Sequence, residues 1–248
     1  MKDYSKIFWI TAIILIIVAF FVANVQITPD LSWVSVIFII FMALPSYLAL
    51  FTWLNWKKAL TLLIALSMFA LAIETFAIIT GIPYSKFTYT NLIGMKLFGY
   101  TPFTVPFSFV PLFIGSLYIA SLKSLSKWKI IVLTALTVLV ADLVLDPAAV
   151  ALNFWVWELD GFFYGVPLMN FIGWLITGFI AGLISVAVLG DKIKDKNKPK
   201  AMLSSLFLII SFWGVVCIYL GLYIPGIIGI IFLIYILKET NGKIGDYS

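Results

Sequence analysis

The chain has 248 residues, of which 63% are apolar and 11% are charged. Soluble domains carry roughly 25% charged residues, so this composition excludes an ordinary soluble fold. The net charge of +5 comes from lysines in short loops rather than from one basic patch, so we expect no nucleic-acid partner. Histidine and arginine are absent, and the single cysteine, Cys217, lies in an apolar run. These features exclude imidazole catalysis, a histidine- or thiol-based metal site and arginine clamps on a diphosphate, and we expect no metal.

The apolar runs reach the length of about 20 residues that a helix needs to cross a bilayer. In chain order we place the spans at 7–24, 31–54, 59–80, 104–122, 128–147, 166–189, 201–219 and 222–238. The first run follows Lys2 and Lys6 and has no small-residue cleavage site, so we interpret it as a span rather than a signal peptide. Gly221 and Pro225 favour a break between the last two spans, although one long bent helix would reduce the count to seven. The sequence therefore predicts an all-α polytopic membrane bundle that forms a single domain over residues 1–248.

The loop charges predict how this bundle is oriented. Lysines follow every second span, at Lys57 and Lys58, at 123–129 and at 191–200. Because loops rich in lysine stay on the cytoplasmic side, we expect the N-terminus and these loops to face the cytoplasm from the cell membrane.

Three carboxyl groups lie inside predicted spans, at Glu74, Asp142 and Asp146. A charged side chain at the centre of a membrane helix costs about 2.5–3.5 kcal/mol, so such residues are candidates for function. Asp142 and Asp146 are four residues apart and share a helix face. Two neighbouring carboxyl groups in a low dielectric do not both ionise cheaply, so we expect at least one to keep its proton and serve as a general acid. Alternatively, Asp146 caps a short helix that begins at Pro147, and Glu74 makes an interhelical hydrogen bond.

The helical rise indicates that these groups share one layer of the membrane. Glu74 lies about 22 Å from the inner face, and Asp142 and Asp146 lie at about 20 and 26 Å. Asn170, near the start of an inward-running span, comes out at about 24 Å. We therefore expect one polar layer in the outer half, covered by the two long outer loops.

The second of these loops, 148–165, concentrates aromatic residues beside the carboxyl groups. They are Trp155, Trp157, Phe162, Phe163 and Tyr164. An interfacial aromatic belt explains each one singly but not their concentration in a segment too short to span. A pocket of aromatic faces would suit a long conjugated or isoprenoid chain and would stabilise a carbocation.

Across residues 74–174 a larger set of residues forms a recognisable pattern. It comprises Glu74, Thr80-Gly81-x-Pro83, Gly94, Leu97, Gly99, Val105-Pro106, Asp142-x-x-x-Asp146-Pro147, Trp155-x-Trp157, Gly161, Tyr164-Gly165-Val166-Pro167, Asn170-Phe171 and Gly173-Trp174. This set resembles the membrane carotenoid hydratases, the bisanhydrobacterioruberin hydratase-like family of carotenoid biosynthesis proteins. The chain departs from the family pattern at Ala77, at Tyr84-Ser85 and at Phe163, which leaves the exact substrate open.

The resemblance implies the addition of water to the terminal carbon–carbon double bond of an acyclic carotenoid or another long isoprenoid, without a cofactor. We expect Asp142 or Asp146 to donate the proton. The other carboxyl group, or Glu74, would polarise the donor or take a proton from the attacking water.

The remaining roles follow from the same implied reaction. Asn170 and Tyr164 would position the water, and Trp155, Trp157 and Trp174 would surround the cation. The implied partners are water, the lipid bilayer and other membrane enzymes of carotenoid synthesis.

Two other functions stay open at this point. A proton-coupled transporter or a lipid carrier would also place acids in the membrane, but the sequence shows neither inverted repeats nor paired broken helices. A UbiA-like prenyltransferase uses two acidic motifs that bind Mg²⁺ and a diphosphate. This chain has one such motif, and no basic residues accompany it.

Overall fold

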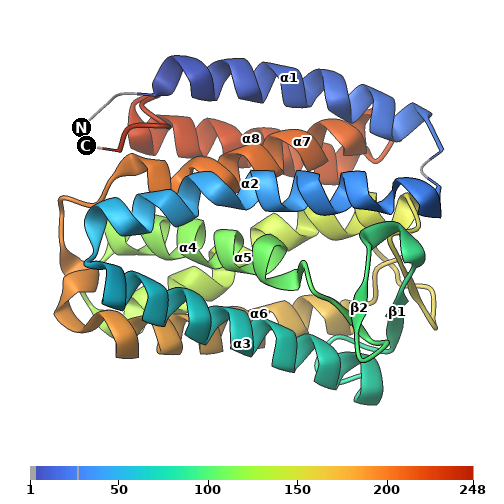
Figure 1. Cartoon of the computed structure of the whole chain (residues 1–248), viewed down its shortest axis with the longest axis horizontal. Coiled ribbons are helices and arrows are strands. Elements are labelled where there is room, and N and C mark those ends of the chain that lie inside the picture. Colours follow the sequence, from blue (N-terminus) through green and yellow to red (C-terminus); the bar gives the residue numbers. More distant parts are fainter. Residues whose placement is uncertain (1–3, 27, 248) are drawn as a thin grey trace.

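The computed structural model describes residues 4–26 and 28–247, and this part of the chain contains eight helices long and apolar enough to cross a membrane (Figure 1). Their bounds are α1 Ser5–Asn24, α2 Ser32–Trp53, α3 Trp56–Thr80, α4 Val105–Lys123, α5 Lys127–Ala151, α6 Leu168–Leu189, α7 Ser204–Tyr219 and α8 Tyr223–Thr240. The predicted all-α membrane bundle is confirmed, and α7 and α8 are separate helices, as the count of eight spans requires.

Short elements occupy the connections between the long helices. The 3-10 helices are η1 Pro29–Leu31, η2 Asn91–Ile93, η3 Gly190–Lys194 and η4 Lys200–Leu203, and the strands are β1 Phe87–Tyr89, β2 Lys96–Leu97, β3 Thr101–Pro102 and β4 Trp155–Trp157. Strand β1 pairs antiparallel with β4, and β2 pairs antiparallel with β3. The β1–β4 pair joins the two long outer loops, with Phe87 opposite Trp157 and Tyr89 opposite Trp155.

Local sequence signals explain where α3 begins and ends. The Asn55 side chain accepts a hydrogen bond from the backbone N–H of Lys58 and caps the N-terminus, so the helix starts before the predicted residue 59. At the other end Gly81 adopts a left-handed conformation with φ of 81°, the usual C-terminal stop. The outer end of α3, which carries Glu74, is therefore sharply defined.

The alternative interpretation of Asp146 is wrong. Asp146 does not cap a short helix at Pro147, because α5 runs without a break through Pro147 to Ala151. Proline removes one backbone donor from a helix, but a buried membrane helix tolerates this loss where its neighbours pack closely around it. Asp142 and Asp146 consequently belong to the same continuous helix.

Helices α4 and α7 form the centre of the bundle, with 83% of each span buried, and the other helices surround them. Small residues bring α6 against α5. A Cβ added to Gly178 would meet the Cα of Ala135 at 2.8 Å, and one added to Gly182 would meet the Cα of Ile131 at 3.1 Å. Glycine at such positions lets two membrane helices approach closely. This packing sets α6 beside the face of α5 that carries the two aspartates.

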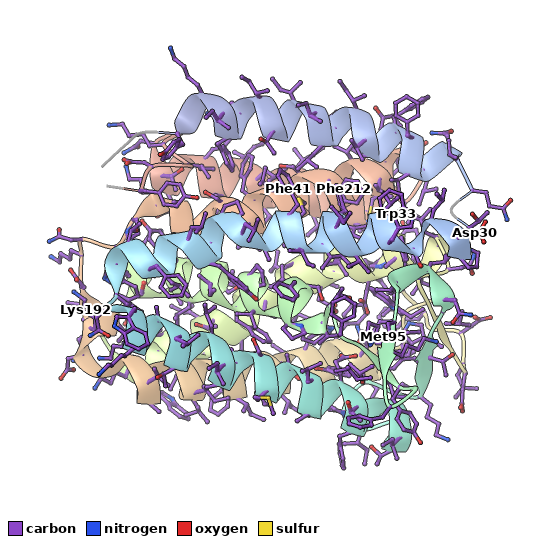
Figure 2. The ribbon with its side chains drawn as sticks, viewed as in Figure 1. Asp30, Trp33, Phe41, Met95, Lys192 and Phe212 are labelled. Atoms are coloured by element: carbon purple, nitrogen blue, oxygen red, sulfur yellow. The ribbon has the colours of Figure 1, made fainter. Side chains whose placement is uncertain are left out.

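The two ends of the bundle differ in charge. Figure 2 shows Lys192 at one end and Asp30 at the other, with Met95 in the loops near the Asp30 end. The β-strands also lie at the Asp30 end (Figure 1). The distribution agrees with the alternating lysine loops of the sequence, while the direction in which the bundle crosses the membrane stays a prediction.

Candidate active site

Asp142, Asp146 and Asn170 form a hydrogen-bonded cluster between α5 and α6. The Asn170 Nδ2 donates to Asp142 Oδ2 at 2.9 Å and to Asp146 Oδ2 at 2.6 Å. The amide NH₂ group carries two protons, so it can donate to both carboxyl groups at once. All three side chains are buried. The structure thus brings together three of the residues that the depth argument placed in one layer.

Asn170 reaches the aspartates from the first turn of α6. Its backbone N–H donates to the carbonyl of Pro167 at 3.0 Å, directly before the helix begins at Leu168. The N-terminal end of a helix carries a partial positive charge that stabilises nearby anions. A negative charge that forms on this cluster is therefore stabilised by two amide N–H groups and by the end of α6.

Glu74 on α3 is held by a residue of the outer loop. The Tyr89 hydroxyl donates to Glu74 Oε2 at 2.8 Å, and both side chains are buried. Strand β1 positions Tyr89, whose carbonyl accepts a hydrogen bond from the Lys96 ammonium and whose ring packs edge-on against Trp155 at 5.7 Å. Burial, and next the charge of the neighbouring Glu74, raise the pKa of the Tyr89 phenol well above its ordinary value. The phenol therefore stays protonated and remains a donor to Glu74.

Glu74, Asp146 and Asn170 open onto one cavity of about 250 Å³. Most of its wall is apolar, and its aromatic residues are Tyr84, Phe87, Tyr89, Phe109, Phe154, Trp155, Trp157, Trp174, Phe38, Phe212 and Trp213. Within the described part of the chain, Asp142 does not line the cavity, although it shares the Asn170 amide with Asp146, which does. The cavity combines carboxyl groups with aromatic faces.

The predicted tryptophans reach the cavity and the predicted tyrosine does not. Trp155, Trp157 and Trp174 all line it, and the buried indole N–H of Trp157 finds no acceptor among the described residues. Tyr164 sits instead in a tight turn with φ of 53°, closed by a 3.1 Å hydrogen bond from the Gly161 N–H to the Gly165 carbonyl. Within the part of the chain that the structure describes, Tyr164 is not in the cavity wall.

The first outer loop supplies two site residues that sequence reasoning missed, Tyr84 and Tyr89. The Tyr84 hydroxyl and the Thr177 hydroxyl lie 2.6 Å apart, and the Tyr84 ring packs where a Cβ on Gly173 would stand, 2.3 Å from its Cδ1. Alternation of buried aromatic and exposed residues in Phe87–Tyr89 is a strand signal, but three residues are too few to predict a strand. Across the described residues, no group of three or more histidine, cysteine or acidic side chains is arranged to hold a metal ion.

Comparison with known proteins finds one matching family and a similar protein of known name. The model of the family described as "carotenoid biosynthesis protein" matches residues 31–236, which include all of the carboxyl groups described above. The chain is also 33% identical over 193 residues to the bisanhydrobacterioruberin hydratase of Haloarcula japonica, a match that covers 74% of this chain and 64% of that protein. The matched region thus spans just under two thirds of the relative's length. No solved structure matches the chain significantly.

Proposed function

Because the chain belongs to the family of carotenoid biosynthesis proteins, we propose that it is a hydratase that adds water to the terminal double bond of an acyclic carotenoid. The observation that carries the proposal is the cavity itself, in which Asp146 and Glu74 face a space walled by aromatic rings inside a membrane bundle. The similar protein from Haloarcula japonica, which is named a hydratase, supports this choice of reaction.

Asp146 is the proton donor in this proposal, because it lines the cavity and Asp142 does not. The π electrons of a trisubstituted alkene are a weak base, so the donor must be a strong acid in a site without bulk water. Burial and the neighbouring Asp142 disfavour two negative charges here, which keeps one proton on the pair. The π electrons take that proton onto the less substituted carbon, and Asn170 stabilises the carboxylate that remains.

The second half of the reaction uses the tryptophans and Glu74, which line the same cavity as Asp146. The faces of Trp155, Trp157 and Trp174 stabilise the tertiary cation through their π electrons. A water oxygen bonds to the cationic carbon, and its proton passes to Glu74 in its ionised form, which Tyr89 holds in place. A proton transfer from Glu74 back to Asp146 through water restores the site. One molecule of water is added and no electron is gained or lost, so the reaction requires no redox cofactor.

The proposed setting is the cell membrane, with the N-terminus and the lysine loops in the cytoplasm. The carboxyl groups then lie in the outer half of the bilayer. The carotenoid reaches them from the lipid phase, and other membrane enzymes of the same pathway supply the acyclic precursor.

Asparagine substitution of the two aspartates tests the function. In a host that makes lycopene, the wild-type protein should yield a pigment heavier by one water in mass spectrometry. Asp146→Asn should lower the yield about 10²-fold or more, since it removes the general acid, and Asp142→Asn should lower it less. Asp160→Asn, on an exposed outer loop, is the matched control and should leave hydration unchanged. Undiminished hydration in both Asp142→Asn and Asp146→Asn would contradict the proposal.

A further inference from the structure

The walls of the cavity differ in exposure from one side to the other. Toward the outer loops the wall is closed, since Ile93 and Phe154 are only 6% and 8% exposed. Toward α1 and α2 the wall is open, since Leu31 and Val34 are each 45% exposed. The cavity is therefore covered on the side of the loops and opens sideways, between two helices.

Helix packing explains the sideways opening. Among the described residues, α1 packs mainly on α7, α2 packs on α4 and α7, and α1 and α2 barely touch each other. Val18 and Val22 of α1, Val34 of α2 and Phe212 of α7 line the same cavity. Figure 2 shows Phe212 in the space between α1 and α2, and its ring contacts Phe38 of α2 with ring centres 4.7 Å apart.

The first outer loop is held in a position that closes the passage between the outer loops and α2. Gly94 lies so close to α2 that an added Cβ would stand 2.5 Å from Cγ2 of Val36. On the opposite side, the Thr90 N–H donates to the Phe154 carbonyl at 3.0 Å and ties the first outer loop to the second. A long molecule therefore cannot pass between the loops and α2 without breaking these contacts.

The chemistry of the opening fits a hydrocarbon chain. Val18, Val22, Leu31 and Val34, which we name the lateral opening, carry no polar side-chain atom, and all of them belong to helices α1 and α2 or to η1. The exposed faces of such helices contact lipid tails. The cavity of about 250 Å³ is smaller than the roughly 300–1,000 Å³ of pockets that enclose a drug-sized ligand, so a whole carotenoid does not fit inside.

We propose that the substrate enters through the lateral opening, with its end group beside Asp146 and its hydrocarbon chain extending between α1 and α2 into the outer half of the bilayer. This inference rests on the proposed hydratase function and adds the route and the part of the substrate that is recognised. One consequence is that a carotenoid with two acyclic ends must leave and re-enter before its second end reacts. A singly hydrated pigment is therefore released as an intermediate.

Blocking the opening with tryptophan tests this route in proteoliposomes. Val22→Trp and Val34→Trp should each lower the hydration of lycopene about tenfold or more, because the long chain then has no exit. Geraniol carries the same kind of end group on a short chain that passes a narrowed opening more easily and fits inside the cavity, so its hydration should fall much less than that of lycopene. The controls Ile17→Trp and Ile37→Trp, exposed residues of α1 and α2 outside the cavity wall, should leave both reactions unchanged.

The outcomes separate this inference from the function on which it rests. If the wild-type protein hydrates neither compound, the hydratase function itself fails. If it hydrates lycopene, but both blocked variants do so equally well or lose both substrates equally, the lateral route is wrong.

A second measurement does not depend on turnover. In the Asp146→Asn background, a photoreactive phenylalanine at position 22 or 34 should cross-link to lycopene. The same group at position 17 or 37 should give only the background of pigment dissolved in the lipid. Equal cross-linking at all four positions would overturn the lateral route.

Discussion

At the scale of single residues, two tyrosines of the same loop make contacts of different chemical kinds. Tyr89 donates a hydrogen bond to the Glu74 carboxyl group, which faces the cavity, and Tyr84 pairs with the Thr177 hydroxyl. Only the first contact orients a group to which we assign a role in proton transfer. The second fixes the loop against α6. Removal of the two hydroxyl groups should therefore affect activity and stability differently.

We expect Tyr89→Phe to lower the turnover of lycopene about tenfold, because Glu74 loses the donor that holds it in position. Tyr84→Phe is the matched control: it keeps the ring in the cavity wall and loses only the contact with Thr177, so it should destabilise the protein by about 1 kcal/mol with turnover retained. Turnover in proteoliposomes and thermal melting in detergent measure the two effects. Equal losses of turnover in both variants would show that Tyr89 acts only on the fold.

The raised pKa of the Tyr89 phenol determines the pH range over which it can donate its hydrogen bond to Glu74. A phenol whose folded-state pKa lies well above the ordinary value of about 10 keeps its proton at neutral and moderately alkaline pH. At neutral and moderately alkaline pH, ionisation of Tyr89 therefore does not break the hydrogen bond to Glu74. Any loss of activity between pH 7 and about pH 10 then has to arise from another group.

At the scale of elements, the sequence predicted the bounds of the helices better than the contacts between them. The apolar runs locate the helix ends to within about four residues, because this signal is local. The depth argument likewise placed Asp142, Asp146 and Asn170 in one layer. It could not show that they touch, because the rotation of a helix about its axis depends on its packing against other helices.

Local sequence signals could not predict the pairing of the two outer loops either, because this pairing also depends on tertiary packing. Strands β1 and β4 have three residues each and lie far apart in the chain, so neither predicts the other. Tyr89 enters the site only through this pairing and was missed. Tyr164 was expected to hold water, but aromatic composition says nothing about the left-handed turn in which it lies.

The close contact of α5 with α6 is the element-scale feature that the cluster requires. Gly178→Val places a Cβ only 2.8 Å from the Cα of Ala135, and we expect it to destabilise the protein by about 1–3 kcal/mol. Because the helices must move apart, the Asn170 amide should no longer reach both aspartates, and hydration should fall. Ala187→Val, on the exposed side of α6, is the control for a β-branched residue in this helix. A Gly178→Val variant as stable and active as the control would contradict this account.

At the scale of the whole molecule, the site's place in the bilayer depends on which way the bundle crosses it. The lysine loops lie at the Lys192 end, opposite the outer loops that cover the cavity (Figure 2). With the lysines in the cytoplasm, the lateral opening faces the lipid of the outer half. With the opposite orientation, the same opening would draw carotenoid from the inner half. Orientation therefore decides which half of the bilayer supplies the substrate.

Single cysteines introduced at the two ends of the bundle measure this orientation in intact cells. Cys217 is buried and should give little background with a membrane-impermeant maleimide. Leu159→Cys, at a side chain that is 73% exposed in the second outer loop, should be labelled from outside. Lys196→Cys, in the exposed lysine-rich loop, should be labelled only after the cells are permeabilised, because lysine-rich loops remain in the cytoplasm. The reverse pattern would place the carboxyl groups and the lateral opening in the inner half of the bilayer.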